Sequence, residues 1–348
     1  MGFRIGGKSC FGNGEIQKRC LHIPKLIQKF ATAEHPIIQP MKSNPKAYIA
    51  LIIVCIFWGT TYLALRIGVK DFPPFLFSGI RQVGAGIILF VAMFFMGKLE
   101  RLTWHDIYRQ AIPGILLITF GNGIIAWAEL YIPSGLAALI VSVMPIYVVV
   151  INLAAGKGEQ QFTTRIIAGF ILGCSGIVLI FKDNLSDLGK PEYLWGILGS
   201  FAACFFWALG SIYIKNNTFR TNAYSNAAIQ FTSGGLGCFL FSLFFDDYSK
   251  FDEITSESLW SLIYLTLIGS ILAYMCYLYA IKYLPIVVVS TYAYVNPVIA
   301  ILLGVAILRE KITGITVLAL AVTLYGVYLI NTGHRNILIK AGEEKLTE

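Results

Sequence analysis

Cys55-Ile-Phe-Trp-Gly59 returns in altered form as Cys204-Phe-Phe-Trp-Ala208, 149 residues further along the chain. Each copy lies in an apolar stretch of about 20 residues, the length that an α-helix needs to cross about 30 Å of hydrocarbon. More pairs follow in the same order and at nearly the same spacing: Arg81 with Gln230, Gly121 with Gly269, Pro133 with Pro285, Pro145 with Pro297, and Gly176 with Gly326. Such a series indicates an internal duplication.

Apolar runs of this kind fill the chain on both sides of the two copies. They cover roughly residues 47–69, 74–97, 110–129, 134–154, 163–182, 194–214, 223–245, 259–281, 285–308 and 312–331. We therefore predict an all-α integral membrane protein with ten transmembrane helices, five in each repeat. Because five is an odd number, the second repeat enters the membrane from the opposite side, so the repeats are inverted.

The composition agrees with a membrane bundle. Hydrophobic residues make up 57% of the chain and charged residues only 13%, whereas a soluble domain carries about a quarter charged residues. The net charge of +8 is scattered over short loops between the runs, which argues against a nucleic-acid partner. The partners we expect are the lipid bilayer and a small-molecule solute, with a homodimer as an alternative to a monomer.

The ends of the chain differ from its middle. Residues 1–45 are mainly polar and weakly basic, and they contain no apolar core of a signal peptide. We expect this N-terminal extension to be disordered or not native, with Met41 as the native start. The first repeat is then predicted at 46–182 and the second at 190–331, followed by a tail at 332–348.

The distribution of lysine and arginine predicts the orientation. Counted from Met41, the loops on the side of the N terminus hold thirteen of these residues and the loops on the other side hold six. Basic residues accumulate on the cytoplasmic side of membrane proteins. We therefore expect both termini in the cytoplasm and a multi-pass protein of the bacterial inner membrane.

The inverted repeats favour a transporter. This architecture supports alternating access around a cavity near the membrane midplane. Pro145 and Pro297 interrupt the fourth and ninth runs, where each removes a helical hydrogen bond and is expected to kink the helix. Such kinks mark a solute path or allow curved helices to pack, and the two explanations can both hold.

Charged side chains inside the apolar runs are the clearest functional signal, because each costs at least about 2.5 kcal/mol at the bilayer centre. Arg81 lies two turns inside the second run, where it can bind a carboxylate or phosphate of the solute or reach the headgroups. Arg66 is nearer an end and is interpreted as a headgroup anchor. Glu129, at the end of the third run, is either a proton-coupling group or the ion partner of Arg66 or Arg81.

Neutral polar and aromatic residues complete the candidate binding site. They lie in the runs near the repeat-related tryptophans and prolines, and each has the alternative of packing or lipid contact. The candidates for solute contact besides Arg81 are Trp58, Trp207, Gln230, Tyr294, Asn296 and Asn122.

Other sequence features predict packing or an absence of chemistry. Gly169-Phe-Ile-Leu-Gly173 is a GxxxG pattern, and glycines recur at 79, 84 and 86, so close helix contact is expected at both places. The cysteines in the runs show no CxxC spacing, which predicts neither a disulfide framework nor a metal site. No nucleotide-binding loop or catalytic motif is visible, so we expect neither an enzyme nor a cofactor.

Several of these residues together resemble a known family. They are Phe57-Trp-Gly-Thr-Thr61, Pro73-Pro74 followed by Arg81, Ala128-Glu129 with Pro133-Ser-Gly-Leu-Ala-Ala-Leu139, and Pro297 followed by Leu308-Arg-Glu-Lys-Ile-Thr313. Their order is similar to that of the EamA-type drug/metabolite transporter superfamily. The resemblance covers about residues 46–331 and implies ten helices, cytoplasmic termini, and export or exchange of small metabolites. Glu159 is one position out of register with Glu310, which departs from the pattern.

The predicted function is therefore a secondary transporter, an exporter of amino acids, their analogues or amphipathic compounds. One alternative is a carrier of nucleotide sugars or lipid-linked sugars, which would need more inward-facing basic residues than Arg81. Another is a membrane enzyme or scaffold, for which no catalytic group or docking domain is visible.

Overall fold

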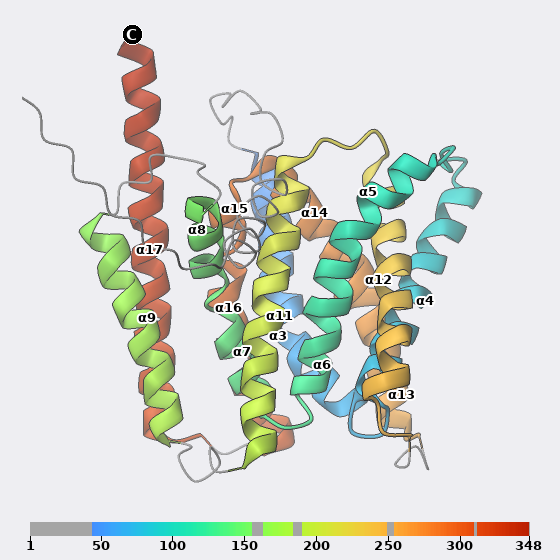
Figure 1. The fold of residues 1–348 in the computed structure, drawn as a ribbon, viewed down its shortest axis with the longest axis horizontal. Coiled ribbons are helices and arrows are strands. Elements are labelled where there is room, and N and C mark those ends of the chain that lie inside the picture. The colour runs from blue at the N-terminus through green and yellow to red at the C-terminus, as the bar shows by residue number, and fades with distance from the viewer. Residues whose placement is uncertain (1–43, 155–162, 184–189, 249–253, 310–311, 348) are drawn as a thin grey trace, which may run out of the picture.

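The computed structural model describes residues 44–154, 163–183, 190–248, 254–309 and 312–347. These residues form helices and no strand, which confirms the all-α prediction (Figure 1). The expectations for residues 1–43, including Met41, and for Glu159 and Glu310 lie outside the described residues.

Helices occupy all ten apolar runs. Those of the first half are α3 (Pro45–Gly68), α4 (Pro74–Phe95), α5–η1–α6 (Trp104–Gly114, Ile115–Gly123, Ile124–Ala128), α7 and α8 (Ser134–Val141, Met144–Ala154) and α9 (Thr164–Asp183). Those of the second half are α11 (Pro191–Asn216), α12 (Ala223–Phe245), α13–η3–α14 (Ser256–Tyr264, Leu265–Leu272, Ala273–Tyr283), α15 and α16 (Ile286–Val289, Tyr292–Leu308) and α17 (Gly314–Thr347).

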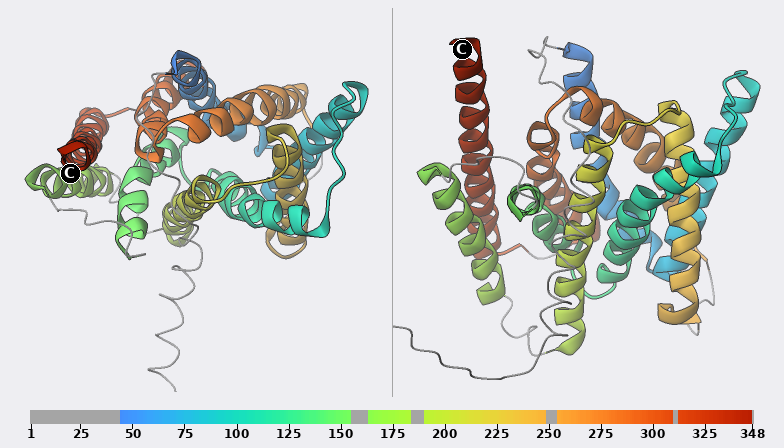
Figure 2. Two further views of the ribbon diagram at one scale, coloured as in Figure 1. Left: turned by 90° about the horizontal axis from the view of Figure 1, so that it is seen from above. Right: turned by 45° about the horizontal axis from the view of Figure 1, so that its top comes forward.

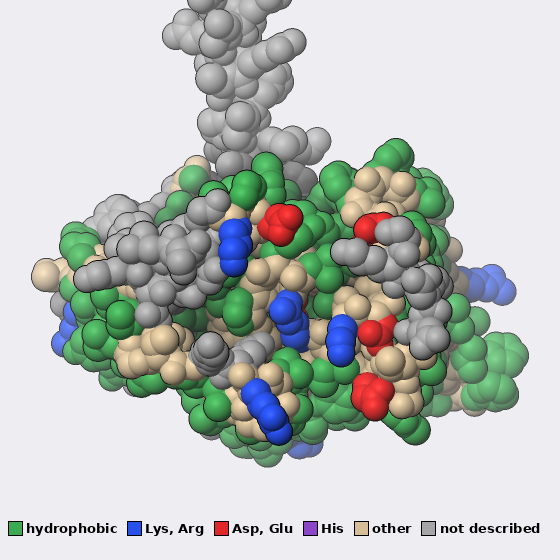
Figure 3. Space-filling model, turned by 90° about the horizontal axis from the view of Figure 1, so that it is seen from below, with side chains coloured by type: hydrophobic (Ala, Val, Ile, Leu, Met, Phe, Trp, Pro, Cys, Tyr) green, Lys and Arg blue, Asp and Glu red, His purple; other side chains and the backbone are tan. Residues whose placement is uncertain are grey.

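Seven candidate spans in the described residues are long and apolar enough to cross a membrane. The runs at Thr164–Gly173, Tyr292–Leu308 and Gly314–Gly326 form shorter apolar helices. The chain is thus a multi-pass membrane protein. Hydrophobic side chains cover the periphery of the bundle end drawn in Figure 3, while charged side chains gather nearer its middle.

Two of the long spans have a π-helical middle that the sequence did not predict. The third run contains η1 and the eighth contains η3, at equivalent places in the two halves. A π-helix has wider turns than an α-helix and is frequent at functional sites. Its occurrence in both halves agrees with the duplication.

The helix interruptions lie close to the expected prolines but do not coincide with them. In the fourth run the chain turns at Ser142-Val143, just before Pro145 at the second position of α8. In the ninth run the turn is at Ser290-Thr291, and Pro297 lies inside α16. The turn of the ninth run thus lies six residues before Pro297, and the expected kink at Pro297 inside α16 stays a prediction.

α9 and α17 lie side by side at one edge of the bundle (Figures 1 and 2). A Cβ atom added at Gly326 of α17 would lie 2.5 Å from the Gly173 nitrogen and 2.6 Å from the Gly169 carbonyl oxygen of α9. The GxxxG pattern therefore provides close contact, as predicted. The pair α4 and α12 is similar, because a Cβ at Gly86 would lie 2.4 Å from Thr232 Oγ1.

Gly326→Leu is expected to separate α9 from α17, because both clashing atoms belong to backbone that cannot rotate away. The melting temperature of the detergent-solubilised protein should fall by several degrees, since overpacking a well-packed interface costs about 1–3 kcal/mol. Gly314→Leu is the matched control, since a Cβ there would meet no atom within 4 Å. Equal melting temperatures for the two variants would contradict this packing.

Asp71, in the connection between α3 and α4, joins the two halves at one end of the bundle. Its Oδ2 accepts hydrogen bonds from Ser258 Oγ at 2.5 Å and from Thr255 at the start of α13. These hydroxyl groups, Ser258 first, hold the pKa of the Asp71 carboxyl below its ordinary value. Because the pKa is lower in the folded protein than in the unfolded chain, the Asp71 carboxylate stabilises the fold at any pH above its ordinary pKa. This stabilisation disappears as the pH falls through the lowered pKa.

Asp71→Asn is therefore expected to lower the melting temperature by a few degrees at pH 7, where the wild-type carboxylate is charged. The difference between variant and wild type should shrink as the pH falls below about 4. Thermal unfolding followed from pH 7 to pH 3 tests this. A difference that stays constant over that range would contradict it.

Candidate functional site

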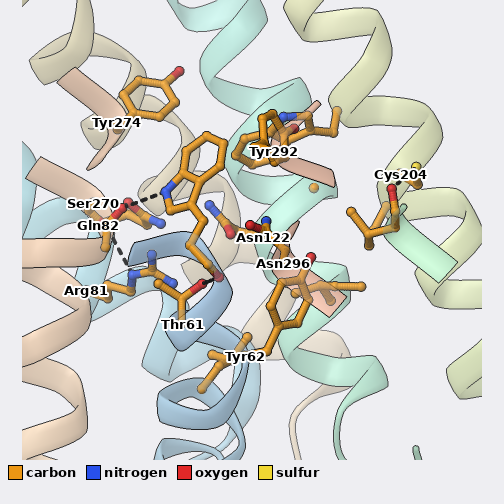
Figure 4. Close-up of a pocket in the computed structure, with 18 of the residues that line it drawn as sticks. Thr61, Tyr62, Arg81, Gln82, Asn122, Cys204, Ser270, Tyr274, Tyr292 and Asn296 are labelled. Atoms are coloured by element: carbon orange, nitrogen blue, oxygen red, sulfur yellow. Dashed lines mark hydrogen bonds between the residues drawn. The ribbon is translucent and has the colours of Figure 1, made fainter. Parts of the chain in front are cut away.

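A cavity of about 70 Å³ lies between the two halves of the chain (Figure 4). Its walls come from α3, α4, η1, α6, α7, α11, α12, η3, α14 and α16. A cavity of this size holds several waters or part of a small solute. Five predicted site residues line it: Trp58, Arg81, Asn122, Trp207 and Asn296.

Arg81 forms the charged part of the cavity wall. Its side chain is buried, with 4% exposed, so it does not reach the headgroups. Nε donates to Ser270 Oγ at 2.9 Å, and Ser270 in turn donates to Gln82 Oε1 at 3.1 Å. Figure 4 shows these three residues together on one wall. Among the described residues that line the cavity, Arg81 is the single charged one.

Aromatic rings form another part of the wall. Trp58 of α3 and Trp207 of α11 meet edge to face with ring centroids 5.4 Å apart, so the repeat-related tryptophans contact each other. Tyr292 packs against Trp58 in the same manner at 4.9 Å. Trp58 Nε1 donates to the Gly269 carbonyl oxygen at 3.1 Å, which fixes this ring against η3.

The two asparagine side chains of the site come from opposite halves. Asn122 belongs to η1, and Asn296 belongs to α16 (Figure 4). With its amide oriented to donate, Asn296 binds the carbonyl oxygens of Cys55 at 3.1 Å and Tyr292 at 3.0 Å. It therefore ties α16 to α3 at the cavity.

Two predicted contact residues lie outside the cavity lining. Gln230 is buried in α12, where its Oε1 accepts from Tyr274 OH at 2.6 Å and its Nε2 donates to Gln110 Oε1 at 2.5 Å. Gln230 therefore holds the cavity residue Tyr274 in place. Tyr294 is half-buried in α16 and does not line the cavity.

Glu129 and Arg66, the other charged residues near the ends of the predicted runs, differ in their burial. Glu129 is fully buried at the end of α6. Its role as a proton-coupling group or as the ion partner of Arg66 or Arg81 stays a prediction. Arg66 is half-buried, and its Nη1 donates to the Ile132 carbonyl oxygen at 3.3 Å. This bond ties the guanidinium to the backbone of the protein, and the interpretation of Arg66 as a headgroup anchor stays a prediction.

Pro145 helps to shape the cavity. A proline has no N–H, so the carbonyl oxygen four residues earlier, that of Val141, loses its helical donor. Cys204 Sγ donates to that oxygen at 3.5 Å, and both Val141 and Cys204 line the cavity. The proline thus leads to a contact between α7 and α11 at the site.

The cavity is also lined by four residues that were not among the predicted site residues: Thr61, Tyr62, Gln82 and Ser270. Each is a neutral residue in an apolar run, where hydroxyl groups commonly bond to their own helix. Gln82 alone had a usable signal, because it adds a second polar group directly after Arg81. Within the described residues, no group of three or more His, Cys, Asp and Glu could hold a metal ion.

Comparison with known proteins gives matches over most of the chain. The model of the EamA-like transporter family matches residues 45–182 and again residues 194–332. The uncharacterized inner membrane transporter YedA of Escherichia coli (strain K12) is 33% identical over 288 residues, covering 82% of this chain and 90% of that protein.

Two further matches are more distant. The probable amino-acid metabolite efflux pump of Escherichia coli (strain K12) is 23% identical, over 82% of this chain and 95% of its own. A solved crystal structure of a protein, 18% identical, covers 85% of this chain and 99% of its own with a TM-score of 0.63, so it shares the fold.

Proposed function

Because this chain belongs to the EamA-like transporter family, we propose that it exports small metabolites, amino acids or their analogues, by alternating access. The observation that carries this proposal is the cavity between the halves, where the described wall contains one cation, three amides and several aromatic rings. Such a wall can bind a small solute that carries a negative group and an apolar body. A relative named as a probable amino-acid metabolite efflux pump supports the solute class.

The proposed architecture is ten membrane spans in two inverted five-helix repeats, at residues 46–182 and 190–331, followed by the tail at 332–348. The family model matches the chain twice, once in each half, which supports the duplication. The paired π-helices and the contact between Trp58 and Trp207 support it as well. Both termini are placed in the cytoplasm because of the lysine and arginine asymmetry.

Other functions receive less support. A carrier of nucleotide sugars has to neutralise two phosphate groups, and the described part of the lining contains one cation, Arg81. An enzyme would need a catalytic set in the cavity, whereas the family and the relatives are transporters.

Flux into proteoliposomes tests the proposal. The purified protein is given radiolabelled amino acids, nucleosides and amphipathic drugs, with and without an imposed pH gradient. We expect flux of amino acids, and no flux of any class by correctly folded protein would contradict the proposed function. If the flux follows the gradient, Glu129→Gln should abolish the coupling, because the amide cannot carry a proton.

A further inference from the structure

Gln82 is a buried amide whose orientation is set by its neighbours. Its side chain is 0% exposed, and it follows Arg81 on α4. Ser270 has one hydroxyl hydrogen, which it donates to Gln82 Oε1 at 3.1 Å while its oxygen accepts from Arg81 Nε at 2.9 Å. The carbonyl side of the amide therefore faces Ser270, and the Nε2 side faces away from it.

Gln82 Nε2 donates to no group of the residues that the structure describes. Buried polar groups are nearly always hydrogen-bonded, and an unused donor in a cavity wall indicates an acceptor on the molecule that occupies the cavity. The Arg81 guanidinium lines the same cavity. Two neighbouring residues, one charged and one neutral, thus contribute to the wall of one cavity.

We propose that Arg81 and Gln82 Nε2 together bind the carboxylate of the solute, with Gln82 as a specificity-determining residue. The inference rests on the proposed transport function and names the group that the site recognises. A carboxylate offers two acceptor oxygens and one negative charge, which matches one guanidinium and one amide. A phosphate dianion would leave one charge uncompensated in this lining.

Gln82→Leu tests the assignment, because leucine keeps the bulk and removes the donor. The probes are the amino acid that wild-type proteoliposomes carry fastest and the carboxamide of that amino acid. We expect KM for the acid to rise about tenfold, since a hydrogen bond to a charged group is lost, with little change for the carboxamide. Thr323→Val, which removes a buried hydroxyl from α17 outside the cavity, is the control.

An unchanged ratio of acid to carboxamide KM in folded Gln82→Leu would overturn this inference and leave the proposed function in place. A wild-type protein that carries no amino acid would remove both. Gln82→Asn, which keeps an amide, should give a ratio nearer to that of the wild type. Fluorescence-detected gel filtration confirms that each variant is folded.

A separate observation concerns two cations at opposite ends of the bundle. Arg66 and Lys215 are 149 residues apart, each in the last turn of the first helix of its half. Figure 1 shows that α3 and α11 run in opposite directions, so these turns lie at opposite ends. The two cations are therefore repeat-related and face opposite sides of the membrane.

Both cations bind the same element of their own half. Arg66 Nη1 donates to the carbonyl oxygen of Ile132, just before the proline that precedes α7. Lys215 Nζ donates at 2.8 Å to the carbonyl oxygens of Ile281 and Leu284, just before the proline that precedes α15. The first helix of each half is thus tied to the junction of its third and fourth helices.

We infer that Arg66 and Lys215 are two latches, one at each end of the cavity, and that releasing one opens that end. Both are closed in this structure, which agrees with a cavity of only about 70 Å³. The Lys215 latch has two bonds of 2.8 Å and the Arg66 latch has one of 3.3 Å. The Arg66 end is therefore expected to open more readily.

Cys204 provides a native reporter, since it lines the cavity and is 1% exposed. Its labelling by a membrane-impermeant thiosulfonate is measured in right-side-out and inside-out vesicles, with Cys204→Ser as the baseline. Arg66→Gln should raise the labelling rate severalfold from the side where α3 ends, and Lys215→Gln from the other side. Arg66→Lys and Lys215→Arg, which keep the donor, should restore slow labelling.

The matched control is Lys282→Gln, an exposed cation of α14 outside the cavity lining. It should leave the labelling unchanged from both sides. Two results would overturn the inference. One is that Arg66→Gln and Lys215→Gln are both labelled at the wild-type rate, and the other is that each of them is labelled faster from both sides at once. The readout does not depend on the identity of the solute.

Discussion

Arg81→Ala is expected to reduce flux of carboxylate-bearing solutes by about 100-fold in proteoliposomes, because it removes the one charge among the described residues that line the cavity. The guanidinium is buried, so its field is weakly screened by water. The change also removes the donor to Ser270. Flux of uncharged amphipathic solutes should fall much less.

Arg81→Lys separates charge from shape. Lysine keeps the positive charge and loses the planar fork, so we expect intermediate flux. Arg165→Ala, at an exposed position of α9, is the control for loss of an arginine. Normal flux of amino acids by folded Arg81→Ala would show that the cavity wall described above does not bind the solute carboxylate.

Much of the fold could be predicted from the sequence, because a lipid environment leaves few choices. An apolar run of about 20 residues has to form a helix whose backbone groups bond to each other. The ten runs therefore coincide with helices to within a few residues at most ends. The π-helical stretches η1 and η3 could not be predicted, since their apolar residues suit an α-helix equally well.

The candidate site was only partly predictable, for a related physical reason. Arg81, Trp58 and Trp207 stood out because charge and repeat position are visible in the sequence, and the structure brings all three to the cavity. Gln230 also has a repeat position, but its place beside Gln110 turns it into a support for Tyr274. Which face of a helix meets the cavity depends on helix rotation, and apolar runs show little periodicity from which rotation can be predicted.

Gly269→Leu is expected to abolish transport. A Cβ atom at Gly269 would lie 2.9 Å from Thr61 Cγ2 and 3.3 Å from Arg81 Nη2, and the rest of the leucine would extend from the cavity wall. A cavity of about 70 Å³ has no room for both this side chain and a solute. We expect flux below about 1% of wild type, since the change displaces the guanidinium and fills the site.

The repeat provides a second test of this prediction, because Gly121 is the counterpart of Gly269. A Cβ at Gly121 would lie 2.7 Å from Trp207 Cε3, while the carbonyl of Gly269 accepts from Trp58, so each π-helix lies against the tryptophan of the opposite half. Gly121→Ala and Gly269→Ala should both slow transport, whereas Gly84→Ala, with its nearest contact at 3.9 Å, should not. If Gly121→Ala and Gly269→Ala both transport as fast as Gly84→Ala, the solute passes outside this cavity. The reason is that the contacts at Gly121 and Gly269 narrow the cavity from opposite halves.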